Sequence, residues 1–293
     1  MEIYYILLAV SIILSVCKSS IYNAYAKRSE PTTIGIFGFN TAVYGVAALI
    51  GLVLFLVGDR AMSAATVISA FFYAAVVFSL QSLSVAAMRV GSMSLTAIFV
   101  MYGMIIPALA GPIFWHEPFG PIQAVGIIMM LLSLWLLNGK MDKDRIGISR
   151  LWISLALLCF VLSGLAGVME KKHQSTDGRE EKAAFVLVAC LFMLLFSLVL
   201  TAISRKRGGG VLRFRPIAVL GGLAGLVVGA YSIVNLTLAG GLDSVVYYPV
   251  ANGGAMLLTV VVSSLIFGER LDMRKSLGVL IGLCGIILLS IPA

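Results

Sequence analysis

The chain has 293 residues, of which 60% are hydrophobic and only 12% are charged, and its net charge is +8. Soluble domains carry about 25% charged residues, so this composition excludes an ordinary water-soluble fold. The basic residues are spread over short polar breaks between apolar blocks, as in membrane proteins, and nucleic acid is not expected as a partner.

Apolar blocks follow one another along the whole chain. Each is about 20 residues long, which matches a helix crossing a hydrocarbon core of ~30 Å. The blocks are continuous rather than alternating, so they predict helices and not a membrane β-barrel. The ten predicted spans are residues 3–25, 34–57, 66–87, 93–114, 119–137, 151–170, 183–203, 216–239, 244–267 and 275–291. We therefore expect a multi-pass protein of the cell membrane, with the lipid bilayer as a partner.

The first block is expected to be a span rather than a cleaved signal, because Glu2 is the only charge before it and no small-residue cleavage site follows. The four cysteines all fall inside predicted spans, where small apolar packing residues are expected. No Cys/His spacing predicts a metal site, and no P-loop occurs, so neither a metal, a cofactor nor ATP is expected.

Lys18 is the unusual residue of the first block. It lies about four residues past the middle of the block, or ~6 Å from the membrane midplane. A lysine near the midplane costs ~2.5–3.5 kcal/mol, so it indicates either snorkelling toward a helix end or a role in a polar cavity. In a cavity it could attract an anionic part of a substrate, or carry a coupling proton.

Polar side chains recur at helical spacing on four spans. They predict either hydrogen bonds between helices, worth ~0.6 kcal/mol on average, or the wall of a binding pocket. We favour a pocket, because stripes on several spans can meet around one cavity. The predicted substrate-binding residues are Ser15, Lys18, Ser19, Tyr22, Gln81, Tyr102, Tyr231, Asn235, Tyr248 and Asn252.

Two prolines lie inside predicted spans. Pro107 and Pro249 are each expected to interrupt a helix, because proline removes a backbone hydrogen bond and frees a carbonyl. Both are predicted as hinge residues, with a simple kink as the alternative.

The end of each half of the chain has the same pattern. HEPFGPIQAVGIIMMLLSLWLL and GERLDMRKSLGVLIGLCGIILL align at an offset of 269 − 117 = 152 residues. The aligned pairs are Glu117 with Glu269, Gly126 with Gly278, and Ser92 with Ser244. This repeat predicts two five-helix halves, residues 1–138 and 151–293, joined by a linker at 139–150. Since five is odd, the second half must be inverted, as is typical of secondary transporters.

A Glu after a long span, followed nine residues later by a Gly, resembles the EamA family of the drug/metabolite transporter superfamily. The resemblance covers nearly the whole chain, although His116 stands where the family usually has Gly. It implies ten helices around a central cavity lined by spans 1, 3, 4, 6, 8 and 9. Glu117 and Glu269 could be proton or substrate groups, but we expect structural roles for them, as acceptors for the N-terminal end of the helix that follows each. Gly126 and Gly278 are expected to be structural.

The fold class we expect is an all-α membrane protein with ten transmembrane helices as two inverted five-helix repeats. The expected function is export of a small polar metabolite, such as an amino acid or related anion, by alternating access. The alternatives are an exporter of cationic drugs and, from another class, a membrane enzyme on lipid-linked groups; no catalytic cluster supports the enzyme. A homodimer is possible.

The side of the membrane on which the termini lie is left open. The loops after the odd-numbered spans hold fifteen Lys and Arg residues and the other loops five, Lys171 among them, which favours termini outside. The resemblance implies cytoplasmic termini.

Overall fold

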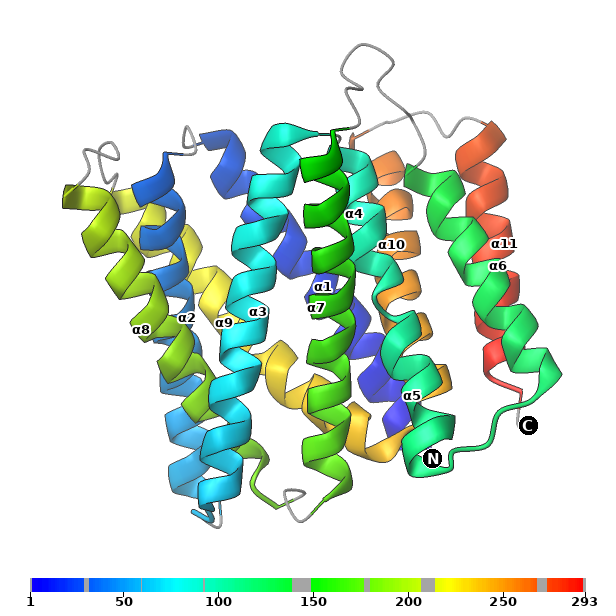
Figure 1. Cartoon of the computed structure of the whole chain (residues 1–293), viewed down its shortest axis with the longest axis horizontal. Helices are drawn as coiled ribbons and strands as arrows, with labels where there is room; N and C mark the ends of the chain where they lie inside the picture. Colours follow the sequence, from blue (N-terminus) through cyan, green and yellow to red (C-terminus); the bar gives the residue numbers. More distant parts are fainter. Residues whose placement is uncertain are drawn as a thin grey trace. The chain divides into compact units, whose positions relative to one another are not determined.

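The structure is a computed structural model and describes residues 2–28, 32–58, 60–91, 93–138, 149–176, 180–206, 214–267 and 273–291. Within these ranges the regular secondary structure is α-helical (Figure 1). The helices are α1 (Glu2–Arg28), α2 (Thr33–Val57), α3 (Ala64–Val90), α4 (Met93–Tyr102), α5 (Ile105–Trp115), α6 (Pro121–Asn138), α7 (Arg150–Ser175), α8 (Lys182–Lys206), α9 (Phe214–Gly241), α10 (Ser244–Phe267) and α11 (Met273–Leu289).

The chain is an integral, multi-pass membrane protein of the all-α class. In the described residues, eight helical segments are long and apolar enough to cross a bilayer, and a shorter apolar helix covers Pro121–Leu137. Large apolar side chains are exposed on many helices, as Val57 at 82% and Phe114 at 69% illustrate. Such surfaces suit hydrocarbon rather than water, because a soluble protein rarely exposes apolar patches of this extent.

The fourth predicted span is two helices rather than one. α4 ends at Tyr102 and α5 begins at Ile105, and the carbonyl of Gly103 accepts from Ile106 N at 3.1 Å. Pro107 has no N–H to donate to Gly103 four residues earlier, which leaves that carbonyl to the tighter bond. The predicted interruption therefore exists, one turn before the proline that causes it.

Pro249 does not interrupt its helix, and that expectation was wrong. α10 runs without a break from Ser244 to Phe267, with Pro249 as its sixth residue. A proline this close to a helix start removes a bond to one of the first carbonyls only. The helix continues because the rest of its backbone ladder is intact.

The helices form two compact units. One contains residues 9–78 and 173–240, and the other contains 1–8, 79–172 and 241–293. We call them the α2–α8 unit and the α6–α11 unit, after the helix pair with the most extensive packing in each. Each unit takes helices from both predicted halves of the chain, so these units are a different division from the predicted repeat, which stays a prediction.

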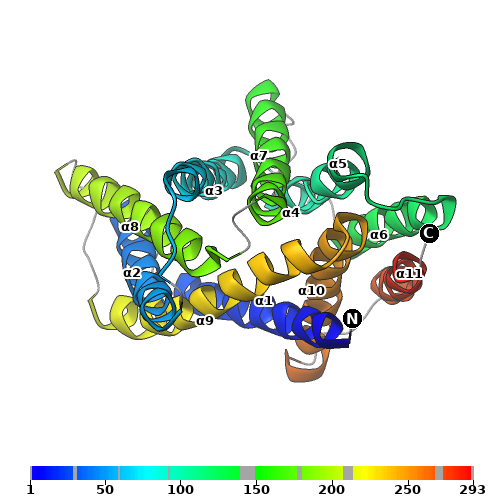
Figure 2. The ribbon, with the colours of Figure 1, turned by 90° about the horizontal axis from the view of Figure 1, so that it is seen from below.

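In the α2–α8 unit, glycines let helices approach closely. A Cβ on Gly225 of α9 would lie 2.6 Å from the carbonyl oxygen of Val43 on α2, and Leu187 of α8 packs against Gly51 of α2. Figure 2 shows α2 beside α8. An aromatic core follows from this packing, with the rings of Tyr25 and Phe39 stacked at 4.0 Å.

In the α6–α11 unit, the two repeat-related glycines lie at one helix pair. Gly126 of α6 lies against Leu289 of α11, and Gly278 of α11 lies against Leu137 of α6. Figure 2 shows the two helices side by side. Ser133 donates its hydroxyl to the Gly278 carbonyl at 2.7 Å. Small residues and a hydroxyl therefore hold α6 and α11 together, as expected for helices in a membrane.

Candidate functional site

Lys18 lies over the face of the Tyr231 ring, with Nζ 4.2 Å from the ring centroid. Lys18 is on α1 and Tyr231 on α9, and both side chains are half-buried. The ring quadrupole attracts the ammonium in this geometry, and more strongly when the pair is desolvated. Lys18 is three residues past the middle of α1, about 4.5 Å along the helix, so the cation sits well inside the span.

The same two helices meet again at a buried polar contact. Ser11 donates its hydroxyl to the Asn235 side-chain oxygen at 2.6 Å, and both residues are less than 10% exposed. Asn235 is one helical turn from Tyr231 on α9. The structure therefore brings three predicted site residues, Lys18, Tyr231 and Asn235, to one contact between α1 and α9.

The other predicted site residues of α1 make contacts of other kinds, within their own helix and with the apolar core. Ser19 donates its hydroxyl to the Ser15 carbonyl of its own helix at 3.0 Å. Tyr22 packs edge-on against Phe39, with centroids 5.1 Å apart, and belongs to the apolar packing of the α2–α8 unit. Their local geometry is that of helix-internal bonding and core packing.

Four predicted site residues lie in the α6–α11 unit. Tyr102 donates to the Leu131 carbonyl at 2.8 Å, which ties α4 to α6. The buried Tyr248 donates to the Gly167 carbonyl at 2.6 Å, and Asn252 donates to the Tyr248 carbonyl at 2.9 Å. Gln81 is half-buried near the end of α3. The bonds of Tyr102 and Tyr248 join two helices each. Such interhelical hydrogen bonds were the predicted alternative to a binding pocket.

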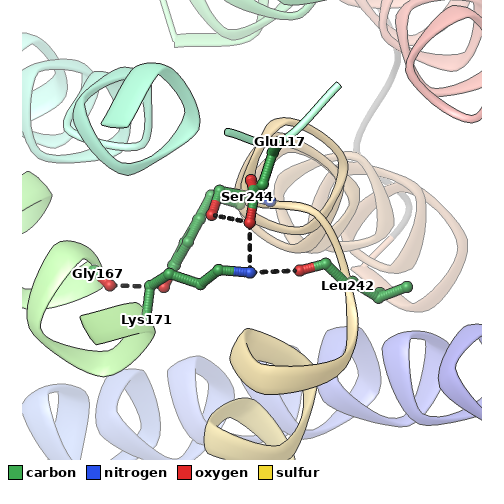
Figure 3. Close-up of polar contacts among 6 residues, drawn as sticks. Glu117, Gly167, Lys171, Leu242 and Ser244 are labelled. Carbon is green, nitrogen blue, oxygen red and sulfur yellow. Dashed lines mark hydrogen bonds and ion pairs between the residues drawn. The ribbon is translucent and has the colours of Figure 1, made fainter. Parts of the chain in front are cut away.

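A buried ion pair is the most strongly polar feature of the α6–α11 unit. Lys171 Nζ lies 2.5 Å from Glu117 Oε1, and the two side chains are 9% and 7% exposed. Lys171 also donates to the Leu242 carbonyl at 2.9 Å, and Ser244 donates its backbone N–H to Glu117 Oε2 at 2.6 Å. The Ser244 hydroxyl contacts Oε1 at 3.3 Å. Figure 3 shows Lys171 and Ser244 converging on the Glu117 carboxylate, and the Leu242 carbonyl on the Lys171 ammonium.

Local structure explains how Glu117 reaches this position. α5 ends at Trp115, and the capping residue His116 has the left-handed conformation, φ 53°, which turns the chain sharply. The carboxylate then lies against Gly111, where a side chain would occupy its place. Ser244 begins α10, so the carboxylate accepts one of that helix's unsatisfied N–H groups and lies at the positive end of its dipole.

The sequence located Glu117 at a helix N-terminus, but the helix is a different one. We expected it to serve the helix that follows it, which is α6, whereas it binds the first turn of α10. Lys171 was counted among the loop residues, whereas it is buried on α7. The counterpart of Glu117 in the repeat, Glu269, lies outside the described residues.

Asp243 adds a second carboxyl group beside the pair. Its carbonyl accepts the first helical bonds of α10, from Val246 and Tyr247. Burial raises the pKa of the Asp243 carboxyl, the charge of Glu117 raises it further, and Lys171 opposes the rise. The ammonium of Lys171 therefore acts on two carboxyl groups.

A related cluster occurs in the α2–α8 unit. Glu181 accepts from the backbone N–H of Ser63 at 3.1 Å and from its hydroxyl at 2.8 Å. Thr66 Oγ1 lies 3.0 Å from Nε2 of the buried His173. A hydrogen bond from Thr66 lowers the pKa of Glu181, burial opposes this, and bonds from Ser63 and the nearby His173 lower it further.

A cavity of about 220 Å³ opens near the end of α2 and the start of α8, and Arg60, Glu180 and Lys182 are among its lining residues. None of the predicted site residues lines it. Its charges are mixed, so its lining favours no ligand class. In the parts of the chain that the structure describes, no three His, Cys, Asp or Glu side chains are grouped to hold a metal ion.

Comparisons with known proteins bear on the fold. No family model matches the chain, and no curated protein matches it. A solved structure described as "Crystal structure of protein" superimposes with a TM-score of 0.78, covering 99% of this chain and 97% of that one, at 11% sequence identity. At this identity the likeness shows the fold alone.

Proposed function

We propose that the chain is a secondary transporter in the cell membrane that exports a small metabolite carrying an anionic group, such as an amino acid, by alternating access. The observation that carries the proposal is the contact between α1 and α9. There, a lysine well inside the first span lies over Tyr231, one turn from the buried Ser11–Asn235 bond. Charged groups inside membrane spans commonly mark substrate or ion pathways.

The Lys18 ammonium has the chemistry to bind a substrate carboxylate. An ammonium offers three donors, and a cation–π contact engages the ring face while leaving N–H groups for an anion. A carboxylate or phosphate group arriving at Lys18 would make a charge-assisted hydrogen bond, roughly twice as strong as a neutral one. This favours zwitterionic and anionic solutes.

The inverted repeat is supported by packing within each unit. The extensive pairs are α2 with α8, and α6 with α11, which are the corresponding spans of the two predicted halves. In the second pair the aligned residues Gly126 and Gly278 lie reciprocally against the partner helix. A two-fold relation between the halves produces such pairing of like with like, and transporters built this way bind substrate near the midplane.

Export of organic cations is a second candidate, favoured by the Tyr231 ring. Its face already receives one ammonium, so a substrate cation could take the place of Lys18. The two candidates make opposite predictions for the Lys18 variant. Removing the lysine abolishes binding of an anion and improves binding of a cation.

The experiment is thermal unfolding of the detergent-purified protein against amino acids, organic acids, sugar phosphates, nucleotide sugars and organic cations. A ligand at 100 times its Kd stabilises a protein by ~2.7 kcal/mol. We expect anionic or zwitterionic compounds to raise the melting temperature of the native chain, and Lys18→Ala to remove the response. Lys206→Ala, which removes an exposed lysine at the end of α8, is the matched control and should respond as the native chain does.

The outcomes separate the two candidates and can reject both. A response to organic cations that grows in Lys18→Ala supports the cation exporter. An anion response that survives unchanged in Lys18→Ala removes Lys18 from the site and contradicts the binding argument.

A further inference from the structure

Three segments far apart in sequence meet at one carboxylate in the α6–α11 unit. Glu117 comes from the turn between α5 and α6, Lys171 from the last turns of α7, and Ser244 from the first turn of α10 (Figure 3). Lys171 also holds the Leu242 carbonyl in the turn before α10. Lys171 of α7 therefore binds the residues just before α10 directly, through Leu242, and binds the first residue of α10 indirectly, through Glu117.

This connection between α7 and α10 differs from ordinary helix packing because it depends on charge. Taking two ions out of water is expensive, and well-packed apolar residues of similar volume often stabilise a fold as well or better. A fixed contact between α7 and α10 therefore does not need an ion pair. The hydrogen-bonded contact of an ion pair has a specific geometry, and a separation that admits water lets each ion be hydrated instead.

Asp243 is a further ionisable group close to the pair. Both Lys171 and Glu117 act on the charge of Asp243, which lies directly before Ser244. Glu117, for its part, keeps the N–H and hydroxyl of Ser244 as donors if Lys171 leaves. If the pair separates, Glu117 therefore keeps polar partners and Lys171 keeps the nearby Asp243.

We propose that Glu117, Lys171 and the first turn of α10 form a gate that holds α7 against α10 and opens once in each transport cycle. The proposal rests on the proposed function, because alternating access requires the helices around the path to separate at each end in turn. It assigns gating to Lys171 and Glu117, as positioning residues that need not touch the solute.

The test measures opening directly, without a solute. Leu242 is 7% exposed and contributes only its backbone carbonyl to the gate, so Leu242→Cys keeps the bond and adds a thiol reporter. The full-length protein in detergent is treated with a charged maleimide, and labelling of each cysteine is followed by mass spectrometry. The buried native residues Cys159 and Cys190 report on loss of the fold.

We expect Glu117→Gln and Lys171→Met to speed labelling of the introduced cysteine by about ten-fold or more, because local opening limits access to a buried group. Cys159 and Cys190 should accelerate much less than position 242, because they become accessible only when the fold as a whole opens. The matched control is Glu181→Gln, which weakens the carboxylate–serine contact of the other unit and should leave the labelling at position 242 unchanged.

Two results overturn the proposal. Unchanged labelling at position 242 in both variants means that the pair does not hold this contact closed. Equal acceleration at positions 242, 159 and 190 means that the pair is a general structural tie. No solute is present in the labelling experiment, so a negative result there rejects the gate alone. The proposed function is rejected separately, by the thermal-unfolding experiment with the panel of ligands.

Discussion

Two clusters share a glutamate–serine contact but differ in burial and in ion pairing. In each, a glutamate just before one helix binds the N–H and hydroxyl of a serine at the start of another, as Glu117 does with Ser244 and Glu181 with Ser63. Glu117 is 7% exposed and ion-paired, whereas the bonds of Glu181 are exposed to solvent. The same hydrogen bonds therefore carry very different energies, since water competes for one set and not for the other.

The largest expected effect follows from breaking the buried pair. Lys171→Met and Glu117→Gln should each lower the free energy of unfolding by up to ~3–5 kcal/mol, because each takes the closest opposite charge from a buried ion that keeps only weaker partners. The measurement is unfolding by SDS titration of the protein in mixed micelles. The double variant Glu117→Gln/Lys171→Met should lose clearly less than the sum of its singles, since neither charge is then left alone. Single variants that lose under ~1 kcal/mol would contradict the contrast between the clusters.

The exposed cluster should give a smaller loss. Glu181→Gln is expected to cost ~0.5–1 kcal/mol near neutral pH, because the serine at the helix start keeps water as a substitute partner. The folded-state pKa of Glu181 is lowered, so its contribution is present above the unfolded pKa and disappears as the pH falls through the folded pKa. The melting temperatures of the variant and the native chain should therefore converge in acid. A gap as large as that of Lys171→Met would remove the distinction by burial.

The smallest expected effect has the opposite sign. Because burial and Glu117 raise the pKa of Asp243, the folded state holds this proton more tightly than the unfolded state. Its contribution is then present at low pH and is lost as the pH rises through the folded pKa. Asp243→Asn should therefore stabilise the protein relative to the native chain, increasingly so as the pH rises. A melting-temperature series over pH checks this, and a gap that shrinks with rising pH would reverse the assignment.

The positions of the helices could be predicted closely from the sequence, because an apolar block of about 20 residues has the length of a membrane-spanning helix. The blocks at 34–57 and 244–267 correspond to α2, Thr33–Val57, and α10, Ser244–Phe267. The break near Gly103 was indicated by Pro107, although its position was not. Pro249 shows why, since the effect of a proline depends on its distance from the helix start, and that start was known only approximately.

Partners were harder to predict than positions. Lys18, Tyr231 and Asn235 were all predicted as site residues. The polar residues on one helix do not, however, identify which other helix they will contact. Lys171 was missed because a charged residue at the end of an apolar block reads as a loop residue. Its burial depends on a carboxylate 54 residues away (171 − 117 = 54), and no local pattern encodes that.

The most direct test of the proposal that the protein is a transporter is solute counterflow in proteoliposomes. Liposomes containing the purified protein are loaded with the compound that gives the largest melting shift, and uptake of the labelled compound is followed. We expect transient accumulation with the native chain and with Lys206→Ala, and none with Lys18→Ala. Absence of counterflow by the native chain, for a compound that demonstrably binds it, would contradict the claim that the protein is a transporter.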